Sequence, residues 1–197
     1  MNTRREQLLR DLERHGREHD AALVDRTQRL RNVEPETAAM MSVLVRGAGA
    51  TRLLELGTSN GYSAIWLADA AEETGGELLS VEVDQGRGGE AAGNVERAGL
   101  SSVVELRVED AAETLAGLPD ADRDFIFLDA ERDTYVSYWP NLVRVLARPG
   151  LLLVDNAISH AEEIAEFRAL VEADERVTVA LIGVGAGVLA IAGNVDR

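Results

Sequence analysis

Five short apolar runs, each suited to one buried strand, recur along the chain from residue 51 onward. They are "TRLLEL" (51–56), "ELLSVEV" (77–83), "VVELRV" (103–108), "DFIFLD" (124–129) and "LLLVDN" (151–156). Apolar residues recur at helical spacing between several of these runs, as in residues 136–146 and 164–171. Strands that alternate with helices form parallel β-α-β units, so the pattern predicts an α/β fold with helices on both faces of a mostly parallel sheet.

The two ends of the chain depart from this alternation. "VTVALIG" and "GVLAIAG" are β-like runs joined by "VGAG", which predicts a hairpin and hence an antiparallel strand on the sheet. The residues before 50 have helical patterns in two or three pieces, and Pro35 suits the first turn of the last piece. We therefore expect one domain over residues 1–197, with a helical N-terminal extension (1–48) and an α/β core (49–197).

Composition excludes several classes of function. The chain of 197 residues has no cysteine, so disulfides and thiolate–metal sites are excluded. A formal charge of −15 argues against nucleic acid as a partner. The charged N-terminus lacks the apolar stretch of a signal peptide, and no apolar run is long enough for a membrane span. We expect a cytoplasmic protein without a membrane partner.

The first 31 residues have their own pattern. Residues 3–31 alternate arginine, glutamate and leucine at helical spacing, which predicts an amphipathic helix with a solvated face. Such helices often pack against a partner subunit, so we expect a homodimer. All 20 basic residues of the chain are arginine, and a single arginine therefore carries less information than usual.

The first apolar run leads into a glycine-containing turn, "LLELGTSNGYSAIWLA". Gly57 and Gly61 bracket a tight strand-to-helix turn in which a ligand can approach the backbone closely. The spacing E-x-G-x-x-x-G differs from the dinucleotide pattern G-x-G-x-x-G, and the Gly-Lys-Ser/Thr of a phosphate loop is absent. The turn therefore suits a ligand without a pyrophosphate and disfavours a nicotinamide dehydrogenase. Glu82, which ends the next run, is placed to accept hydrogen bonds from ribose hydroxyls.

Together these motifs resemble the class I S-adenosylmethionine-dependent methyltransferases, and within them the small O-methyltransferases of the catechol and caffeoyl-CoA type. The glycine turn, "SVEVD", "DFIFLDAERDTYVSYW" and "GLLLVDNAI" carry the resemblance, which spans about residues 33–193. It implies a Rossmann-like sheet of seven strands with an antiparallel last strand, in agreement with the hairpin pattern.

The resemblance also implies roles for individual residues. Glu82 would bind the ribose of S-adenosylmethionine, and Asp129 would close the site beneath its methionine part. The methionine and sulfonium side would meet Glu55, Gly57, Ser59, Gly61 and Ser63, and the adenine would lie near Asp110 and Ala111.

In that family the aspartate that ends strand four and the "DN" that ends strand five bind a divalent cation. Here these residues are Asp129, Asp155 and Asn156. All three are hard oxygen ligands, suited to Mg²⁺ or Ca²⁺. A simple turn would use the same "VDN" residues, but two such ends on adjacent strands favour a metal site.

The chain departs from the family at two points. Arg132 stands where the family carries a lysine base, and arginine stays protonated, so it can bind an anion or stabilise an oxyanion but cannot accept a proton. His160 is the alternative candidate base. The long tryptophan-bearing insertion after "DN" is also missing, which implies a more open site and leaves the acceptor undefined.

Three hypotheses of function follow. The first is an S-adenosylmethionine-dependent O-methyltransferase, assisted by a divalent metal, that acts on a hydroxyl of a small molecule. The second is an RNA methyltransferase of the same fold, because residues 1–31 hold eight arginines against six acids. The third is a cofactor-binding protein whose catalysis is lost or altered, given Arg132. The sequence names neither the acceptor, the metal nor the oligomeric state.

Overall fold

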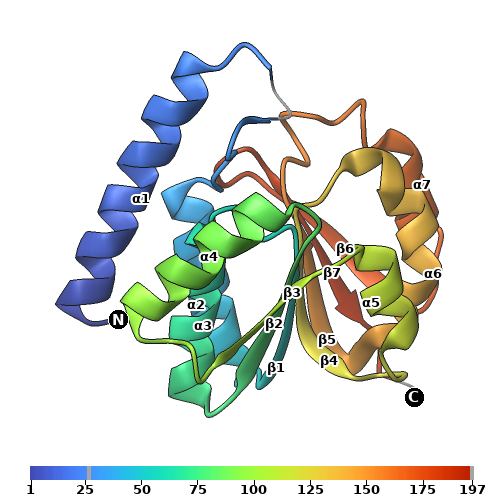
Figure 1. Ribbon diagram of the computed structural model, residues 1–197. Coiled ribbons are helices and arrows are strands. Elements are labelled where there is room, and N and C mark those ends of the chain that lie inside the picture. The colour runs from blue at the N-terminus through green and yellow to red at the C-terminus, as the bar shows by residue number, and fades with distance from the viewer. Residues whose placement is uncertain (26–27, 196–197) are drawn as a thin grey trace.

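One mixed sheet organises the computed structural model, which describes residues 1–25 and 28–195 (Figure 1). Within these residues the sheet has seven strands in the order β3-β2-β1-β4-β5-β7-β6. β1 to β5 pair in parallel, whereas β7 runs antiparallel to β5 and β6. The predicted α/β fold and its antiparallel hairpin strand are confirmed. The strands are β1 (Arg52–Leu56), β2 (Glu77–Glu82), β3 (Val104–Val108), β4 (Arg123–Leu128), β5 (Leu146–Val154), β6 (Val177–Ile182) and β7 (Val188–Gly193).

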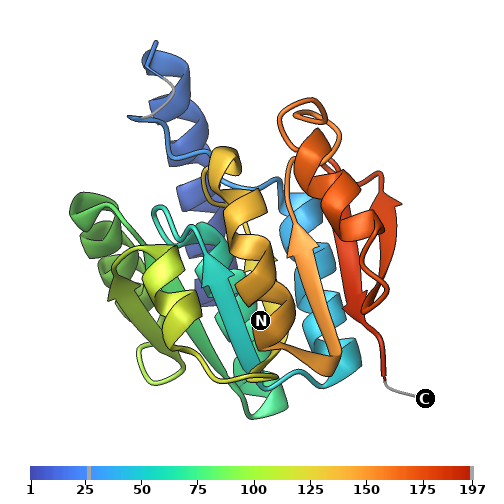
Figure 2. The same ribbon diagram turned by 90° about the vertical axis from the view of Figure 1, so that its right-hand side faces the viewer.

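Helices cover both faces of this sheet (Figures 1 and 2). They are α1 (Thr3–Ala22), α2 (Pro35–Ala48), α3 (Tyr62–Thr74), α4 (Gln85–Ala98), α5 (Ala111–Gly117), the 3₁₀ helix η2 (Arg132–Thr134), α6 (Tyr135–Val145) and α7 (Ala165–Glu172). Side chains of α1 to α4 form one apolar cluster with one face of the sheet, and those of α5 to α7 form a second with the other face. Successive strand residues point to opposite faces, so Leu53 belongs to the first cluster and Leu54 to the second.

The parallel register brings the carboxyl ends of five strands to one edge of the sheet. Leu56 at the end of β1 pairs with Val81 of β2 and Leu128 of β4, and Leu128 pairs with Val154 of β5. β1 is followed by β2 on one side, while β4 returns to its other side, so the strand order reverses between β1 and β4. Sheets of this type bind ligands in the crevice at such a switch point.

Several elements differ from the sequence prediction, among them α4 and β5. α4 was not predicted, because its four glycines are weak helix formers. At Gly88 a small residue is needed, since a β-carbon there would stand 2.6 Å from Val108 Cγ2. β5 begins at Leu146 rather than at residue 151, because the chain before the predicted strand already pairs with β4 through Arg123 and Leu146.

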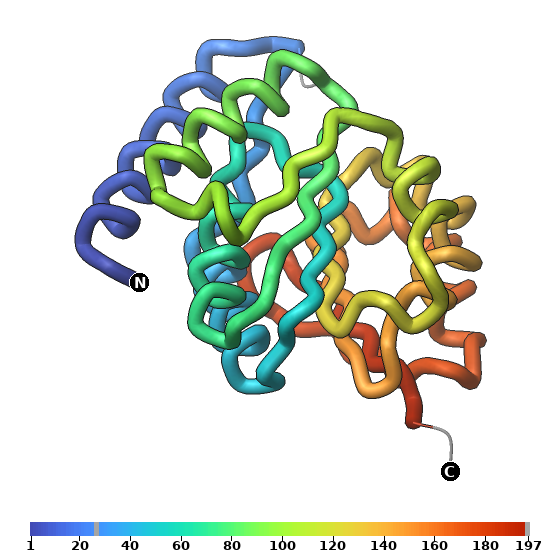
Figure 3. The backbone as a smooth tube through the Cα atoms, turned by 60° about the horizontal axis from the view of Figure 1, so that its bottom comes forward, coloured from blue at the N-terminus to red at the C-terminus, as the bar shows by residue number. Residues whose placement is uncertain are grey.

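α1 packs its apolar face within its own chain. Leu8, Leu9 and Leu12 are buried in the apolar cluster where α1 packs against α3 and α4. The views of Figures 1 and 3 agree that α1 runs beside α4. The amphipathic helix predicted over residues 3–31 is present only as far as Ala22, where α1 ends. Its apolar face is not left for a partner subunit, so the homodimer stays a prediction. No described helix, α1 included, has the length and the apolar sequence needed to span a membrane.

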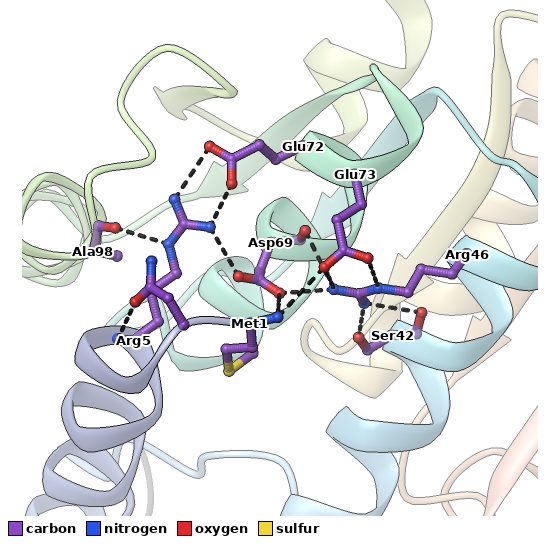
Figure 4. A network of polar contacts seen from close by, with 9 residues as sticks. Met1, Arg5, Ser42, Arg46, Asp69, Glu72, Glu73 and Ala98 are labelled. Carbon is purple, nitrogen blue, oxygen red and sulfur yellow. Dashed lines mark hydrogen bonds and ion pairs between the residues drawn. The ribbon is translucent and has the colours of Figure 1, made fainter.

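A buried carboxylate fastens α1 to the other helices of this face (Figure 4). Asp69 of α3 is 1% exposed and accepts hydrogen bonds from Arg5 of α1 at 2.8 Å and from Arg46 of α2 at 2.7 Å. The same two arginines also form ion pairs with the half-exposed Glu72 and Glu73. Three helices therefore depend on one charge that solvent does not reach.

Asp69→Asn tests this dependence. We expect the free energy of unfolding to fall by about 3 kcal/mol, the low end for breaking a buried ion pair, because Arg5 and Arg46 keep their outer partners. Urea denaturation measures the change. The matched control is Glu172→Gln, which removes an exposed pair with Arg168 on α7 and should cost less than about 1 kcal/mol. Equal unfolding midpoints for the two variants would contradict the prediction.

Candidate active site

A cavity of about 470 Å³ opens at the edge of the sheet where the strands end. Its wall contains residues that follow each of β1 to β5, together with residues 29–34, which connect α1 to α2. Figure 1 shows this connection above the carboxyl ends of the strands. The cavity therefore coincides with the switch point in the strand order.

Most of the residues predicted for the site meet in this cavity. Gly57, Ser59, Ser63, Glu82, Asp110, Ala111, Asp129, Arg132, Asp155, Asn156 and His160 line it. Glu55 and Gly61, both predicted to contact a cofactor, do not. Glu55 points below the glycine turn, because the alternation of β1 turns it toward Ser80 of β2. Gly61 is the N-cap residue of α3 and faces Ala91 of α4, whose Cα would lie 3.2 Å from a β-carbon at that position.

The glycine turn after β1 lies directly against the end of β4. Gly57 has a φ of 102°, and a β-carbon there would stand 2.2 Å from the backbone oxygen of Asp129. Only glycine fits both the backbone conformation and the space. This contact forms the floor of the cavity between the end of β1 and the end of β4.

Glu82 is held in the β2 side of the cavity by the backbone. Its Oε2 accepts a hydrogen bond from Ser59 N at 2.8 Å, and its Oε1 accepts one from Asp84 N at 3.0 Å. The side chain is buried, yet each carboxylate oxygen can accept a further bond from a ligand hydroxyl. The glycine turn and the end of β2 thus hold the Glu82 carboxylate in place as a hydrogen-bond acceptor.

Two carboxylates lie together on the other side, the half-buried Asp129 at the end of β4 and the buried Asp155 at the end of β5. The amide Nδ2 of Asn156 bridges them, at 3.4 Å from Asp129 Oδ1 and 3.0 Å from Asp155 Oδ2. Burial raises the pKa of both carboxyl groups, and the charge of Asp129 raises the pKa of Asp155 further. The second oxygen of Asp155, Oδ1, is buried and has no hydrogen-bond partner among the described residues.

This set of donors fits a divalent cation. A cation would offset the repulsion between the two carboxylates and would provide a partner for the orphaned Oδ1 of Asp155. Among residues 1–25 and 28–195, no three acidic or histidine side chains cluster closely enough to hold a metal by themselves. Water and ligand oxygens would therefore complete the coordination, which is the arrangement that Mg²⁺ favours.

Two arginines place positive charge beside Asp129. Arg132 in η2 has a side chain that is 9% exposed and forms an ion pair with Glu163, with Nε 3.0 Å from Oε2. Arg31 forms an ion pair with Glu131 at 2.5 Å. Both guanidinium charges lower the pKa of Asp129, against the larger effect of burial. Arg132 thus lies in the cavity wall, where its charge acts on Asp129.

His160 is joined to the same group through a neighbour. Its Nδ1 lies 2.8 Å from Ser159 Oγ, and that hydroxyl donates to Asn156 Oδ1 at 3.2 Å. The imidazole therefore acts on the orientation of the Asn156 amide as well as lining the cavity.

Residues 29–34 are a part of the site that the sequence analysis missed. The backbone oxygen of Leu30 accepts a hydrogen bond from Ser59 Oγ at 2.7 Å. The carboxylate of Asp20 accepts from the backbone N–H groups of Leu30 and Arg31 at 2.7 and 2.8 Å. These residues were assigned to a helical extension, and only the Pro35 that follows them signalled a break.

The sequence matches a family model described as O-methyltransferase over residues 5–192. Among relatives, a catechol O-methyltransferase of Niastella koreensis is 36% identical over 139 residues, which are 68% of this chain and 62% of that protein. A catechol O-methyltransferase of Mycobacterium tuberculosis is 32% identical over 134 residues, again 68% of this chain and 60% of that protein. The matches thus span less than two thirds of these relatives.

The fold agrees with a solved structure of the same kind. The O-methyltransferase TomG of Streptomyces achromogenes, which is involved in tomaymycin synthesis and was solved in complex with SAM, has a TM-score of 0.79 at 25% identity. The alignment covers 95% of this chain and 90% of that one. The chain belongs to the O-methyltransferase family, as the resemblance of its motifs indicated.

Glu55, below the cavity, is an acid that solvent does not reach. Its Oε2 accepts a hydrogen bond from Ser80 Oγ at 2.5 Å, and its Oε1 has no partner among the described residues. Its pKa is raised to about 8, mainly by burial; hydrogen bonds from Ser63 and Ser80 oppose the rise, and the charges of Asp129 and Glu82 add to it. The folded protein therefore holds a proton here at neutral pH.

Glu55→Gln tests that proton through stability. Between pH 4.5 and about 8 the folded state keeps a proton that the unfolded chain has lost, so this group makes wild-type stability fall as the pH rises. The variant lacks this group. From pH 6 to pH 8 we expect the free energy of unfolding to fall by about 2 kcal/mol more in the wild type than in the variant. Urea denaturation at both values measures it, and parallel pH profiles would contradict it.

Proposed function

We propose that this protein transfers a methyl group from S-adenosylmethionine to a hydroxyl of a small molecule, with the help of a divalent cation. One observation carries the proposal: a single cavity joins Glu82, held by the glycine turn, to the pair of carboxylates Asp129 and Asp155. Membership of the O-methyltransferase family supports the reaction, and the catechol O-methyltransferases among the relatives support a hydroxylated acceptor.

The order of the strands suggests which residues hold each part of S-adenosylmethionine. Asp110 and Ala111 follow β3 and would hold the adenine, and Glu82 at the end of β2 would accept bonds from the ribose hydroxyls. The methionine part would lie along the turn after β1, where Gly57, Ser59 and Ser63 line the cavity. The adjacent strand in the sheet is β4, so the sulfonium side would meet Asp129.

When bound, S-adenosylmethionine supplies a methyl group on a positively charged sulfur, and a divalent cation supplies charge that holds acceptor oxygens and eases ionisation of a hydroxyl. Asp129, Asp155 and Asn156 would hold the cation. Asp155 is buried, and the attachment of all three residues to the ends of two paired strands fixes their positions.

Arg132 has an electrostatic role in this proposal. Its guanidinium stays charged, and the ion pair with Glu163 keeps it in the cavity wall beside Asp129. It would therefore attract the negative charge of an ionised acceptor rather than remove a proton. His160 would orient Asn156 through Ser159 and stays a candidate proton acceptor.

The cofactor site is tested by Glu82→Ala. The variant should bind S-adenosylmethionine more weakly by about 1.5–3 kcal/mol, the range for hydrogen bonds to a charged group. Isothermal calorimetry measures the affinity, and Glu82→Gln shows the effect of charge alone. Glu105→Ala, an exposed residue of β3 outside the cavity, should bind like the wild type. Wild-type affinity in Glu82→Ala would remove Glu82 from the site.

The reaction and its cation are tested together with catechol as acceptor and mass spectrometry of the product. Wild type with Mg²⁺ should form the methyl ether. A chelator, or Asp155→Asn, should slow transfer about 100-fold or more, because a bound cation contributes several kcal/mol. S-adenosylmethionine affinity should stay within about threefold. Asp133→Asn, an exposed neighbour outside the cavity wall, is the control.

Two outcomes would count against this proposal. Full activity in the presence of the chelator would show that no metal takes part and that the "VDN" residues form only a turn. Tight cofactor binding without transfer to any of a panel of catechols would instead indicate a cofactor-binding protein with lost or altered catalysis.

A further inference from the structure

Glu34 differs from every other acid of the cavity wall. Eight acidic residues line the cavity, and within the described chain only the Glu34 side chain has neither a hydrogen bond nor an ion pair. The other seven each accept a hydrogen bond, namely Asp20, Glu82, Glu109, Asp110, Asp129, Glu131 and Asp155. A half-buried carboxylate without a partner in a cavity is available to a ligand.

Its position is at the carboxylate end of the cavity. Glu34 is the N-cap residue of α2, yet its side chain makes no capping hydrogen bond. Its Oε2 lies against the loop between β6 and β7, 3.1 Å from the place of a β-carbon on Gly185. Its charge acts on both Asp129 and Asp155, whose pKa values it raises. The side chain therefore faces the side where an acceptor would bind, not the side of Glu82.

The proposed reaction needs a proton acceptor at this end. Arg132 cannot accept a proton, and Glu131 is neutralised by Arg31. Asp129 and Asp155 would be occupied by the cation. His160, whose Nδ1 hydrogen-bonds to Ser159, is the competing candidate in that wall. Glu34 is the remaining carboxylate in that wall.

We propose that Glu34 is a catalytic residue that removes the proton from the acceptor hydroxyl, an assignment that rests on the proposed function. The proton passes to the Glu34 carboxylate, and the electron pair of the O–H bond stays on oxygen. The oxygen forms a bond to the methyl carbon as the carbon–sulfur bond breaks, and that electron pair stays on sulfur to give S-adenosylhomocysteine. Glu34 then releases the proton to water.

A carboxylate is strong enough for this step. If the oxygen kept its proton while the new bond formed, the product would be a protonated ether, which is a very strong acid. Transfer of the proton to the carboxylate therefore becomes favourable as the new bond forms. General bases that act in the transition state in this way contribute about 10²–10⁴-fold to the rate.

Glu34→Gln and two acceptors test the assignment. With catechol, we expect kcat of the variant to fall by about 10²–10⁴-fold. With 4-nitrocatechol in mildly alkaline buffer, where the acceptor is already ionised, the loss should be less than about tenfold. Formate should restore part of the activity of Glu34→Ala toward catechol. Glu36→Gln, an exposed residue of α2 outside the cavity wall, is the matched control, and calorimetry with S-adenosylmethionine verifies that each variant is folded.

Each other result overturns the assignment. Wild-type rates with both acceptors would show that Glu34 takes no part. Equal losses with both acceptors would show a role in binding or positioning. If the wild type binds S-adenosylmethionine but methylates neither acceptor, the proposed function is wrong, and the assignment of Glu34 fails with it.

Discussion

The in-register pairing of β1, β4 and β5 is the constraint on which the site depends. Leu56, Leu128 and Val154 stand in one row, so the residues that follow them emerge side by side. The close contact of Gly57 with the backbone of Asp129 fixes the turn against that row. A shift of one residue in either pairing would turn the carboxylates of the β4 and β5 ends to opposite faces, because side chains alternate along a strand.

The same edge concentrates negative charge that folding does not favour. Asp155 and Glu55 are buried and Asp129 is half-buried, and the loss of solvent shifts all three carboxyl groups toward the protonated form. The opposite situation holds on the far side of α3, where the buried Asp69 is balanced by two arginines. The buried charge that joins helices is thus fully paired, whereas Asp155 at the cavity keeps an unpaired oxygen that a ligand can satisfy. Strain of this kind is typical of functional sites.

The sequence predicted what local residues determine. The apolar runs gave the strand positions, the hairpin gave the antiparallel strand, and the acids at strand ends gave most of the cavity wall. α4 escaped notice because its helix is stabilised by packing rather than by its glycine-rich sequence. Glu34 and residues 29–34 escaped because their positions depend on distant contacts, such as that of Leu30 with Ser59. Glu55 was predicted to contact the cofactor because of its place in the glycine-turn motif. Its position on β1 instead directs its side chain to Ser80.

The connection between α1 and α2 touches both halves of the cavity, through Leu30 at the glycine turn and through Arg31 at Glu131. Substitutions in such a shared segment are coupled rather than additive. An attempt to engineer the acceptor preference through residues 29–34 would therefore also alter the affinity for the methyl donor. Selection for a new acceptor would have to act on this segment and on the turn after β1 together.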